Sequence, residues 1–394
     1  MHNPHYILFD TPGRDLMYPF THTRPMAACR IGILTIQEKW ERWLGVSCSH
    51  YTAEYLQPKY PLQLSPEGKN LLINGHILPN AALVEAIREL KPGQELFKEN
   101  HLVAKYVDGK DFFNPVAQAD RLSFEGVFTR IDHPWELHLH NAVALQDDFE
   151  LLTAGRESAP IDPGNQVVGA GNIFLEEGAV VTHSILNAST GPIYIGKDAL
   201  IMEGCMIRGG LALLDGAVMK MGTKIYGAVT VGKQGIVGGE IKNSIFFDYS
   251  NKSHDGYIGD AVIGEWCNLG AGTSCSNIKN NGSEVKIWME AKNEAWPAGL
   301  KCGVLMGDYS RCAIQTMFNT GTVIGVSCNI FGGTFPPKFV PSFTWGGIGL
   351  SERYRLAEAL RDVTSWMLFK KKSPSESEKQ ILTYIFEQQN SGLA

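Results

Sequence analysis

Between Ile195 and Val237 an apolar residue recurs at every sixth position, and this period limits the possible folds more than any other feature of the chain. The ladder consists of Ile195, Ile201, Ile207, Leu213, Met219, Ile225, Val231 and Val237. A helix repeats every 3.6 residues and a strand every 2, so neither alone produces a strict period of six. Short strands of about one hexad, separated by corners, do produce it, because three hexads close a triangular coil whose apolar side chains point inward. The sequence therefore predicts a parallel β-helix.

The ladder extends in both directions from this stretch. Its further members are Val168, Phe174, Val180 and Leu186 upstream, and Ile263, Leu269, Cys275, Met306, Cys312, Phe318, Ile324 and Ile330 downstream. Two changes of phase, at 187–194 and 243–262, and one insertion, at 276–300, interrupt it. Interruptions of a solenoid mark places where loops leave the coil, and loops commonly carry function. We therefore look for functional residues near these breaks.

The composition excludes several classes of protein. The 394 residues are enough for two or three domains, the net charge is −6, and Lys and Arg are scattered, so no nucleic-acid partner is expected. The first ten residues lack a basic segment followed by an apolar one, and no run of about 18 apolar residues occurs. We expect a cytoplasmic protein without a membrane partner. Eight cysteines with no CxxC pair indicate reduced, structural thiols.

Residues 1–150 lack the six-residue period of the ladder and show a different pattern of predicted elements. Segments 6–9 and 71–74 are predicted strands, and segments 30–44 and 80–90 are predicted helices. Strands that alternate with helices indicate an α/β domain, in which ligands bind at the carboxyl ends of the strands. The ends of the two predicted strands are therefore the places to look for a site.

Segments at these strand ends resemble the sugar nucleotidyltransferase family. GRDLMYPFTHTRP (13–25) resembles its glycine-rich signature, and LLINGHILPN (71–80) resembles its magnesium-binding Asn-Gly-Asp segment. The resemblance implies transfer of a nucleotidyl group to a sugar 1-phosphate, which would form a UDP- or dTDP-sugar. The nucleotide-binding positions that it implies are Gly13, Arg14, Arg24, Asn74 and Gly75.

The chain departs from this family at positions that matter chemically. Gly13 stands alone where several glycines would let backbone N–H groups approach a triphosphate. Arg24 takes the position of the catalytic lysine, and His76 stands where Mg²⁺ needs a carboxylate. The domain is also shorter than the family's fold. It is either a reduced domain that keeps turn and packing residues or an active nucleotidyltransferase, and Mg²⁺ is expected only in the second case.

An amphipathic helix is predicted over 132–148, between the α/β domain and the ladder. Its histidines, His133, His138 and His140, do not share one helical face. A zinc site needs ligands that converge. We therefore expect packed or solvated histidines here, and no metal site.

Lys224 and Lys242 are the most informative charges of the ladder. They are three hexads apart, which is one full coil, so they are predicted to stack on one face about 4.8 Å apart. Two ammonium groups at that distance repel each other unless an anion lies between them. The pair is interpreted either as a phosphate site or as two solvated surface lysines.

The segment 236–277 resembles the acetyltransferase half of the bifunctional glucosamine-1-phosphate acetyltransferase/N-acetylglucosamine-1-phosphate uridyltransferase family. The matching stretches are Gly238 to Lys242, Ser253 to Gly264, Asn268 to Thr273, and Ser276 with Asn277. The order of the two domains agrees with this family as well. Hexapeptide acyltransferases have a left-handed β-helix, so the resemblance also implies the hand.

The same resemblance assigns roles to individual residues. It makes His254 the general base, and it places Lys224, Lys242, Tyr257 and Asn268 at the sugar phosphate. The positions that it places at the acetyl-CoA side are Ala271 and Asn277. The chemistry is consistent, because an amine that attacks a thioester must lose a proton and a histidine that titrates near neutrality can take it.

Two regions beyond this segment depart from the family or from the ladder. Ile278 and Lys279 replace the tyrosine and aspartate expected after Asn277, which leaves the sugar pocket over 276–300 undefined. The prolines and aromatic residues of 331–347 are predicted to stop the coils and to cap the solenoid. Helices are predicted over 350–370 and from Ser373 to about Gln388, the second with Ile381, Tyr384 and Ile385 facing inward.

The sequence thus predicts a reduced, nucleotidyltransferase-like α/β domain (1–150), a left-handed β-helix of hexapeptide repeats (151–345) and C-terminal helices (346–394). Three functions remain open: an acyl-CoA-dependent transferase acting on a sugar phosphate or nucleotide sugar, a sugar-1-phosphate nucleotidyltransferase, or a non-catalytic nucleotide-sugar-binding protein. The related acyltransferases form their sites between neighbouring prisms, so we expect a homotrimer with His254 near a subunit interface.

Overall fold

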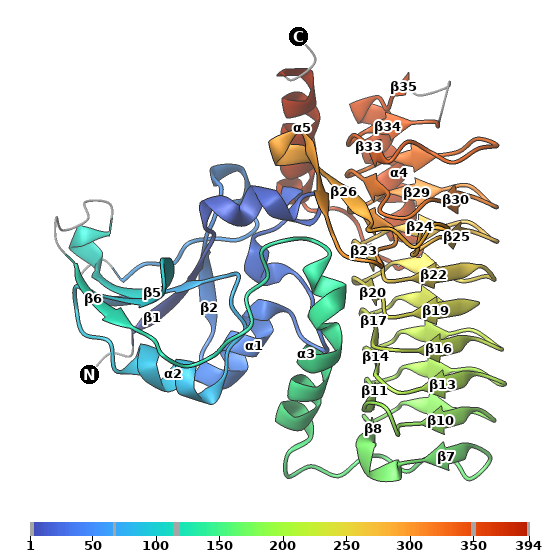
Figure 1. Cartoon of the computed structure of the whole chain (residues 1–394), viewed down its shortest axis with the longest axis horizontal. Helices are drawn as coiled ribbons and strands as arrows, with labels where there is room; N and C mark the ends of the chain where they lie inside the picture. Colours follow the sequence, from blue (N-terminus) through green and yellow to red (C-terminus); the bar gives the residue numbers. More distant parts are fainter. Residues whose placement is uncertain (1–3, 66–67, 113–118, 348–351, 392–394) are drawn as a thin grey trace. The chain divides into compact units, whose positions relative to one another are not determined.

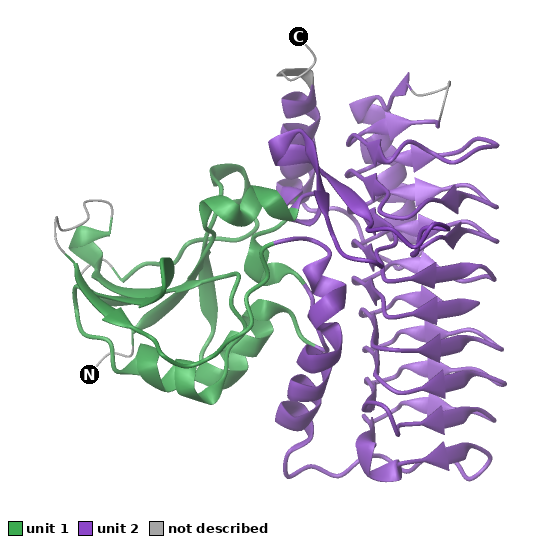
Figure 2. Ribbon diagram, viewed as in Figure 1, with its two compact units in different colours: residues 1–17, 23–29, 34–132 green, residues 18–22, 30–33, 133–394 purple. Residues whose placement is uncertain are grey.

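The computed structural model describes residues 4–65, 68–112, 119–347 and 352–391. The chain divides into two compact units (Figure 2). The first, called the N-terminal unit, comprises residues 1–17, 23–29 and 34–132. The second, called the solenoid unit, comprises residues 18–22, 30–33 and 133–394. The boundary between the compact units lies after residue 132, ahead of the next helix. The division into three domains at residues 150 and 345 stays a prediction.

The N-terminal unit is built on one mixed sheet of six described strands in the order β2-β1-β3-β5-β4-β6. The strands are β1 (His5–Phe9), β2 (Cys48–Tyr51), β3 (Lys69–Asn74), β4 (Gln94–Lys98), β5 (His101–Asp108) and β6 (Asp120–Ser123). β1 lies parallel to both β2 and β3, whereas β5 is antiparallel to β3. The predicted α/β class is confirmed, and the two predicted strands are β1 and β3.

Two helices accompany this sheet, α1 (Ile36–Leu44) and α2 (Ala81–Arg88). α1 begins later than predicted, because the Thr35 side chain accepts from the Glu38 N–H and Glu38 caps Thr35 in return. It ends where predicted, at Gly45, whose φ of 77° is a left-handed conformation that glycine adopts without a Cβ clash. Asn80 caps α2 through the Leu83 N–H.

The solenoid unit contains the predicted parallel β-helix, whose coils stack in Figure 1. The first sheet contains β7 (Gln166–Val168), β10 (Ile185–Asn187), β13 (Met206–Arg208), β16 (Lys224–Tyr226), β19 (Glu240–Lys242) and β22 (Tyr257–Gly259). The second contains β8 (Ile173–Leu175), β11 (Ile193–Ile195), β14 (Leu211–Leu213), β17 (Val229–Val231), β20 (Ile245–Phe246), β23 (Val262–Ile263), β28 (Leu305–Met306), β31 (Val323–Ile324) and β33 (Phe339–Val340).

The third sheet contains β9 (Val180–Val181), β12 (Leu200–Ile201), β15 (Val218–Met219), β18 (Ile236–Val237), β21 (Asn251–Lys252), β24 (Asn268–Leu269), β29 (Arg311–Cys312), β32 (Asn329–Ile330), β34 (Thr344–Trp345) and β35 (Glu352–Arg353). β25 (Ser274–Cys275) pairs with β30 (Met317–Phe318) in a further short sheet. The 3-10 helices of the chain are η1 (Pro12–Met17), η2 (Phe20–His22), η3 (Met26–Ala28), η4 (Glu54–Leu56), η5 (Gly109–Asp111), η6 (Ala170–Asn172) and η7 (Glu290–Lys292).

The hexad ladder forms the core of the solenoid. Its eight members from Ile195 to Val237 are at most 2% exposed, and all eight predicted downstream members are buried with them. Upstream the prediction fails for three of four members: Val168 and Val180 are about half exposed, and Phe174 stacks on Tyr194 outside the inward column, which Leu175 joins opposite Ile195. The reason is coil length: the register pairs Val181 with Ile201, so this coil is longer than three hexads and Val181 points inward instead of Val180.

The insertion at 276–300 leaves the coil as predicted. It forms an antiparallel hairpin of β26 (Lys286–Met289) and β27 (Glu294–Pro297), visible beside the solenoid in Figure 1. The prediction that 331–347 stops the coils is wrong, since β33 and β34 extend the second and third sheets by one more coil. This is possible because Pro336 and Pro337 lie in the loop ahead of β33 and take no place in a ladder.

Three helices complete the described part of the solenoid unit: α3 (Glu136–Thr153), α4 (Leu356–Leu368) and α5 (Glu376–Ser391). α4 and α5 pack on each other, as the two predicted C-terminal helices, although Tyr384 is 38% exposed instead of inward. No helix in the described residues is long and apolar enough to cross a membrane. The eight cysteines, all within the described residues, are buried and none forms a disulfide.

α3 packs on β17 and β20 of the second sheet and fixes the segment 30–33. The Asn141 side chain accepts from the Gly32 N–H at 2.7 Å and donates to the Ala228 carbonyl at 3.1 Å. Asp148 accepts from the Ile33 N–H at 2.7 Å. Only glycine fits at position 32, where φ is 73° and an added Cβ would lie 2.6 Å from the Ala144 carbonyl oxygen.

The ladder predicts a large cost for a cavity in the solenoid core. Ile225→Ala should lower the free energy of unfolding by about 2–5 kcal/mol, because Ile225 is 1% exposed and its neighbours above and below are ladder residues. Met206→Ala, on the outward side of the same sheet, is the control and should change it by less than about 1 kcal/mol. Chemical denaturation measures both, and equal effects would contradict the inward ladder.

Candidate active site

A cluster of polar side chains projects outward from the first sheet of the solenoid. Tyr226 donates its hydroxyl to Glu240 at 2.6 Å, and the Lys242 ammonium lies 5.7 Å from the centre of the Tyr226 ring. The register places Tyr226 opposite Lys242, and Glu240 opposite Tyr257. The structure thus brings the predicted residues Lys242 and Tyr257 to one face, together with Tyr226 and Glu240, which the sequence analysis did not select.

Lys224 lies on the same face but does not stack on Lys242 as predicted. It lies opposite Glu240, because the coil that joins these two positions is shorter than three hexads. A carboxylate beside Lys224 removes the repulsion on which the predicted phosphate clamp rested. The predicted stacking of the two lysines is therefore wrong, while both remain outward-facing on neighbouring strands.

The two phenols of the cluster act as hydrogen-bond donors. The hydrogen bond to Glu240, together with burial, raises the pKa of Tyr226 to about 12. Burial and the neighbouring acidic groups raise the pKa of Tyr257 above its ordinary value. Both hydroxyls therefore stay protonated at neutral pH. Because Tyr226 gives its proton to Glu240, the Lys242 ammonium and the Tyr257 hydroxyl are the donors that this surface offers to a phosphate or a polyhydroxy sugar.

His254 lies at the exposed corner that leads from β21 into β22, three residues before Tyr257. Its side chain is therefore accessible beside the strand that carries Tyr257. Asn268 lies on β24 of the third sheet, whereas Ala271 lies on the corner after β24, which stacks on the His254 corner of the preceding coil: the Gly272 N–H donates to the Asp255 carbonyl at 3.0 Å. The chain by itself therefore brings His254, Tyr257 and Ala271 to neighbouring positions, and it leaves Asn268 on the third sheet.

Asn277 is buried and belongs to a polar ladder along one edge of the coils. The Asp260 carboxylate accepts from the Asn243 side-chain amide at 2.7 Å on one side and from the Asn277 amide on the other. The three residues recur at one constant spacing, which the sequence shows and which could have revealed the ladder. The amide of Asn277 is thus engaged within the fold, and its role at the acyl donor stays a prediction.

Lys252 is a functional candidate that the sequence analysis missed. It lies opposite the ladder residue Val237, it is 1% exposed, and its ammonium donates to the carbonyls of Gly238 at 3.0 Å and His254 at 2.7 Å. Burial lowers the pKa of Lys252 to about 8. The change of phase at 243–262 concealed it, because counting hexads from Val237 does not reach position 252.

The N-terminal unit gathers its predicted residues at the carboxyl ends of β1, β2 and β3. Arg14 pairs with Asp10 through Nε at 3.3 Å and donates to the Tyr55 hydroxyl at 2.6 Å. Asp10 also accepts from the Met26 N–H at 2.9 Å and from the Thr52 hydroxyl. The side chains of Arg14 and Asp10 are only 8% and 6% exposed. Arg14 is thus held by protein groups at the position where a nucleotide phosphate was predicted.

The other predicted nucleotide-binding positions also have structural partners. The Asn74 amide donates to the Leu102 carbonyl at 2.9 Å, and its oxygen accepts from the His76 N–H at 3.0 Å. Gly75 packs so closely that an added Cβ would lie 3.2 Å from the Phe9 carbonyl oxygen. Arg24 is buried, and Gly13 donates its N–H to the Thr11 hydroxyl at 3.2 Å. These contacts fit a packing role.

The residues at this edge do not fit Mg²⁺. Asp10 is the carboxylate at the centre of the cluster, and burial raises its pKa, although the Thr52 hydroxyl and Arg14 act in the opposite direction. Mg²⁺ requires anionic or neutral oxygen ligands in octahedral geometry. Arg14 already neutralises Asp10, and the described residues contain no group of three or more His, Cys, Asp or Glu that could hold a metal ion. We derive no metal-dependent step here.

The predicted signature 13–25 is divided between the two units. Residues 18–22 belong to the solenoid unit, where His22 lies 2.9 Å from Glu290 of the insertion and stacks on Tyr18 at 3.7 Å between ring centres. Gln389 of α5 donates to the same Glu290 at 3.1 Å. Part of the segment that would bind a triphosphate therefore serves as a packing element of the solenoid.

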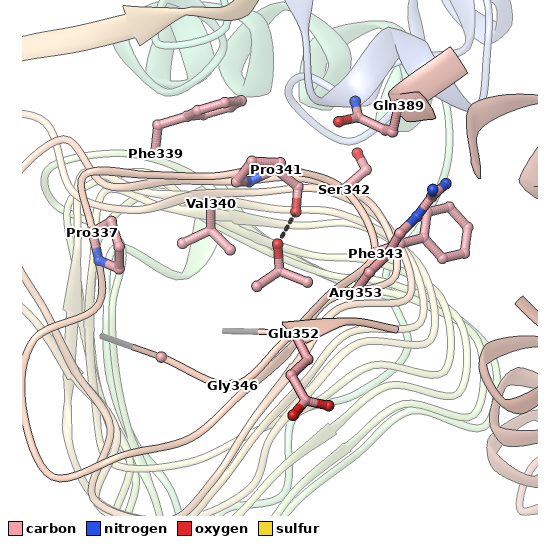
Figure 3. Close-up of a pocket in the computed structure, with 12 residues that line it drawn as sticks. Pro337, Phe339, Val340, Pro341, Ser342, Phe343, Gly346, Glu352, Arg353 and Gln389 are labelled. Atoms are coloured by element: carbon pink, nitrogen blue, oxygen red, sulfur yellow. Dashed lines mark hydrogen bonds between the residues drawn. The ribbon is translucent and has the colours of Figure 1, made fainter. Parts of the chain in front are cut away.

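A pocket of about 360 Å³ lies at the C-terminal end of the solenoid (Figure 3). Residues between Pro337 and Gly347 line most of it, together with Glu352, Arg353 and Gln389. None of these is a predicted site residue. The pocket reflects the open end of the last coil and is separate from the cluster on the first sheet.

The buried Lys252 predicts a pH-dependent stability. A lysine with a folded pKa of about 8 and an unfolded pKa of about 10.4 binds fewer protons when folded, so the stability that it confers rises as the pH increases from about 8 to 10.4. Lys252→Met should remove about 2–3 kcal/mol of this rise in the free energy of unfolding. Denaturation at pH 7 and pH 10 measures it, with the exposed Lys301→Met as control. If the free energy of unfolding depended on pH equally in all three proteins, the lowered pKa of Lys252 would be contradicted.

Comparisons with known proteins give matches to this chain. Residues 6–157 match the family model described as sugar nucleotidyl transferase. The bifunctional protein GlmU of Methanococcus maripaludis is 27% identical over 214 residues, which are 52% of this chain and 43% of that protein. The bifunctional sugar-1-phosphate nucleotidylyltransferase/acetyltransferase of Sulfurisphaera tokodaii is 33% identical over 94 residues, 24% of this chain and 23% of that protein.

The solved structure of the polySia-specific acetyltransferase NeuO aligns with 52% of this chain and 93% of its own, with a TM-score of 0.30 and 13% identity. The chain spans less than half the length of the two curated relatives. The matches confirm the resemblance inferred from the motifs: this chain is similar to bifunctional sugar-1-phosphate nucleotidylyltransferase/acetyltransferases, with a sugar nucleotidyl transferase-like N-terminal region followed by a parallel β-helix.

Proposed function

We propose that the chain is an acyltransferase that transfers the acetyl group of acetyl-CoA to the amino group of a hexosamine 1-phosphate or a related sugar. The observation that carries the proposal is the cluster of Lys242, Tyr226 and Tyr257 on the first sheet, next to the exposed corner of His254. The name of the Sulfurisphaera relative, which includes acetyltransferase, supports the reaction class.

In the proposed reaction His254 is the general base. The sugar amine attacks the thioester carbonyl, a C–N bond forms, the C–S bond breaks, and CoA leaves as a thiolate that takes up a proton. His254 accepts the proton that the amine loses. Lys242 and the phenol of Tyr257 bind the sugar phosphate by donating hydrogen bonds to its oxygens, and Tyr226, held by Glu240, packs beside Lys242.

The site is completed by a second chain in this proposal. Asn268 lies on the third sheet, away from the cluster on the first sheet, whereas Ala271 lies on the corner that stacks on the His254 corner of the same chain. A cyclic homotrimer can bring the first sheet of one chain against the third sheet of its neighbour, so that the neighbour's Asn268 reaches the sugar while Ala271 faces the acyl donor beside His254.

Nucleotidyl transfer by the N-terminal unit is the second candidate, and the match of residues 6–157 to the sugar nucleotidyl transferase family model favours it. The paired Arg14 and Asp10 and the poor fit to Mg²⁺ weigh against it. Pyrophosphate release from UTP or dTTP with a panel of sugar 1-phosphates would support it. Binding of a nucleotide sugar without turnover in either assay would indicate a non-catalytic binding protein instead.

His254→Asn should lower kcat of acetyl transfer by about 100-fold or more, because general-base catalysis contributes about 10²–10⁴-fold to rates. Release of CoA thiol with glucosamine 1-phosphate and related amino sugars measures the rate. His183→Asn is a matched control, since His183 is another exposed histidine at a corner of the solenoid. Full activity in His254→Asn, or no binding of acetyl-CoA at millimolar concentration, would refute the proposal.

A further inference from the structure

A lysine occupies an inward position of the solenoid core. In the third sheet the inward column runs through Ile201, Met219 and Val237 to Lys252, and each of these residues is at most 1% exposed. The positions before Lys252 in this column are apolar, as a ladder of buried side chains requires. A buried ammonium in an apolar column is unfavourable unless hydrogen bonds compensate it.

The ammonium of Lys252 finds these hydrogen bonds at two corners of the coil. It donates to the Gly238 carbonyl, which follows β18, and to the His254 carbonyl, which follows β21. The two corners touch, since a Cβ added to Gly238 would lie 2.5 Å from the Ser253 carbonyl oxygen. Lys252 therefore joins the corners of successive coils from inside the core.

The corner that Lys252 holds is longer than the corner beneath it. Two residues, 238 and 239, connect β18 to β19, whereas four residues, 253–256, connect β21 to β22. The latter part of the longer corner is fixed by Glu240 and Gly272, whose N–H groups donate to the carbonyls of Gly256 at 3.2 Å and Asp255 at 3.0 Å. Its first part, with His254, is held by Lys252.

We infer that Lys252 is a positioning residue for His254: from within the core it fixes the main-chain carbonyl of His254 and thereby the direction in which the imidazole leaves the corner. This inference rests on the proposed role of His254 as the general base. Lys252 itself lies inside the core and touches neither substrate. The acidic group nearest to it along the chain is Asp255, on the same corner.

A double-mutant cycle tests the inference through activity. Lys252→Met keeps an unbranched side chain in the column, and it should lower kcat by about 10- to 100-fold with the KM for the sugar phosphate changed by less than about twofold. Combined with His254→Asn it should add no further loss, since Lys252 acts through His254. Additive losses in the double variant, or a kcat for Lys252→Met within twofold of the unmodified enzyme, would overturn the inference.

Hydrogen exchange gives a readout that does not depend on turnover. The amides of Glu240, Tyr257 and Gly272, which donate hydrogen bonds at this corner, should exchange at least about tenfold faster in Lys252→Met than in Leu269→Met, a matched change in the next coil of the same column. Unchanged exchange at this corner overturns the inference whether or not the enzyme is active. Faster exchange in a protein whose unmodified form transfers no acetyl group supports the anchoring of the corner and refutes the proposed function alone.

Discussion

Stacking of one aliphatic side chain on the next, coil after coil, is the interaction on which the rest of the solenoid depends. Each ladder residue contacts its equivalents above and below, and burial of each contributes about 1.5–3 kcal/mol. Because the core needs only the inward positions, the outward positions of the same strands are free to vary. This is why Lys242 and Tyr257 can stand on strands whose central residues, Ile241 and Ile258, are fully buried.

The candidate site residues gather where the coil departs from three full hexads. Lys224 and Glu240 face each other on successive coils, although their separation in the sequence is two residues less than three hexads. For the pairs Glu240 and Tyr257, and Asn243 and Asp260, the separation is one residue less than three hexads. A shorter coil changes which side chains face each other without disturbing the inward ladder. The same region contains the short corner 238–239, on which the four-residue corner of His254 stacks. Irregular coils therefore supply the local geometry that a uniform solenoid lacks.

The sequence predicted the parts of the structure that follow from period and missed those that follow from contacts between coils. Hexad counting identified the core from Ile195 to Val237, but it failed at Val180, because a coil longer than three hexads shifts the phase. Motif resemblance selected His254 and Lys242 as candidate site residues, whose roles stay predictions. It could not show that Lys252 turns inward or that Arg14 pairs with Asp10, because these depend on three-dimensional register and burial.

In the proposed trimer one acyl-transfer site forms between two chains, with His254 from one and Asn268 of the third sheet from the next. Co-assembly of two inactive variants, His254→Asn and Asn268→Arg, tests this sharing most directly. If the site is shared, random mixing leaves about one quarter of the sites with an intact His254 and an intact Asn268, and that fraction of the activity should return. A mixture no more active than its separate components would show that no site is shared in this way.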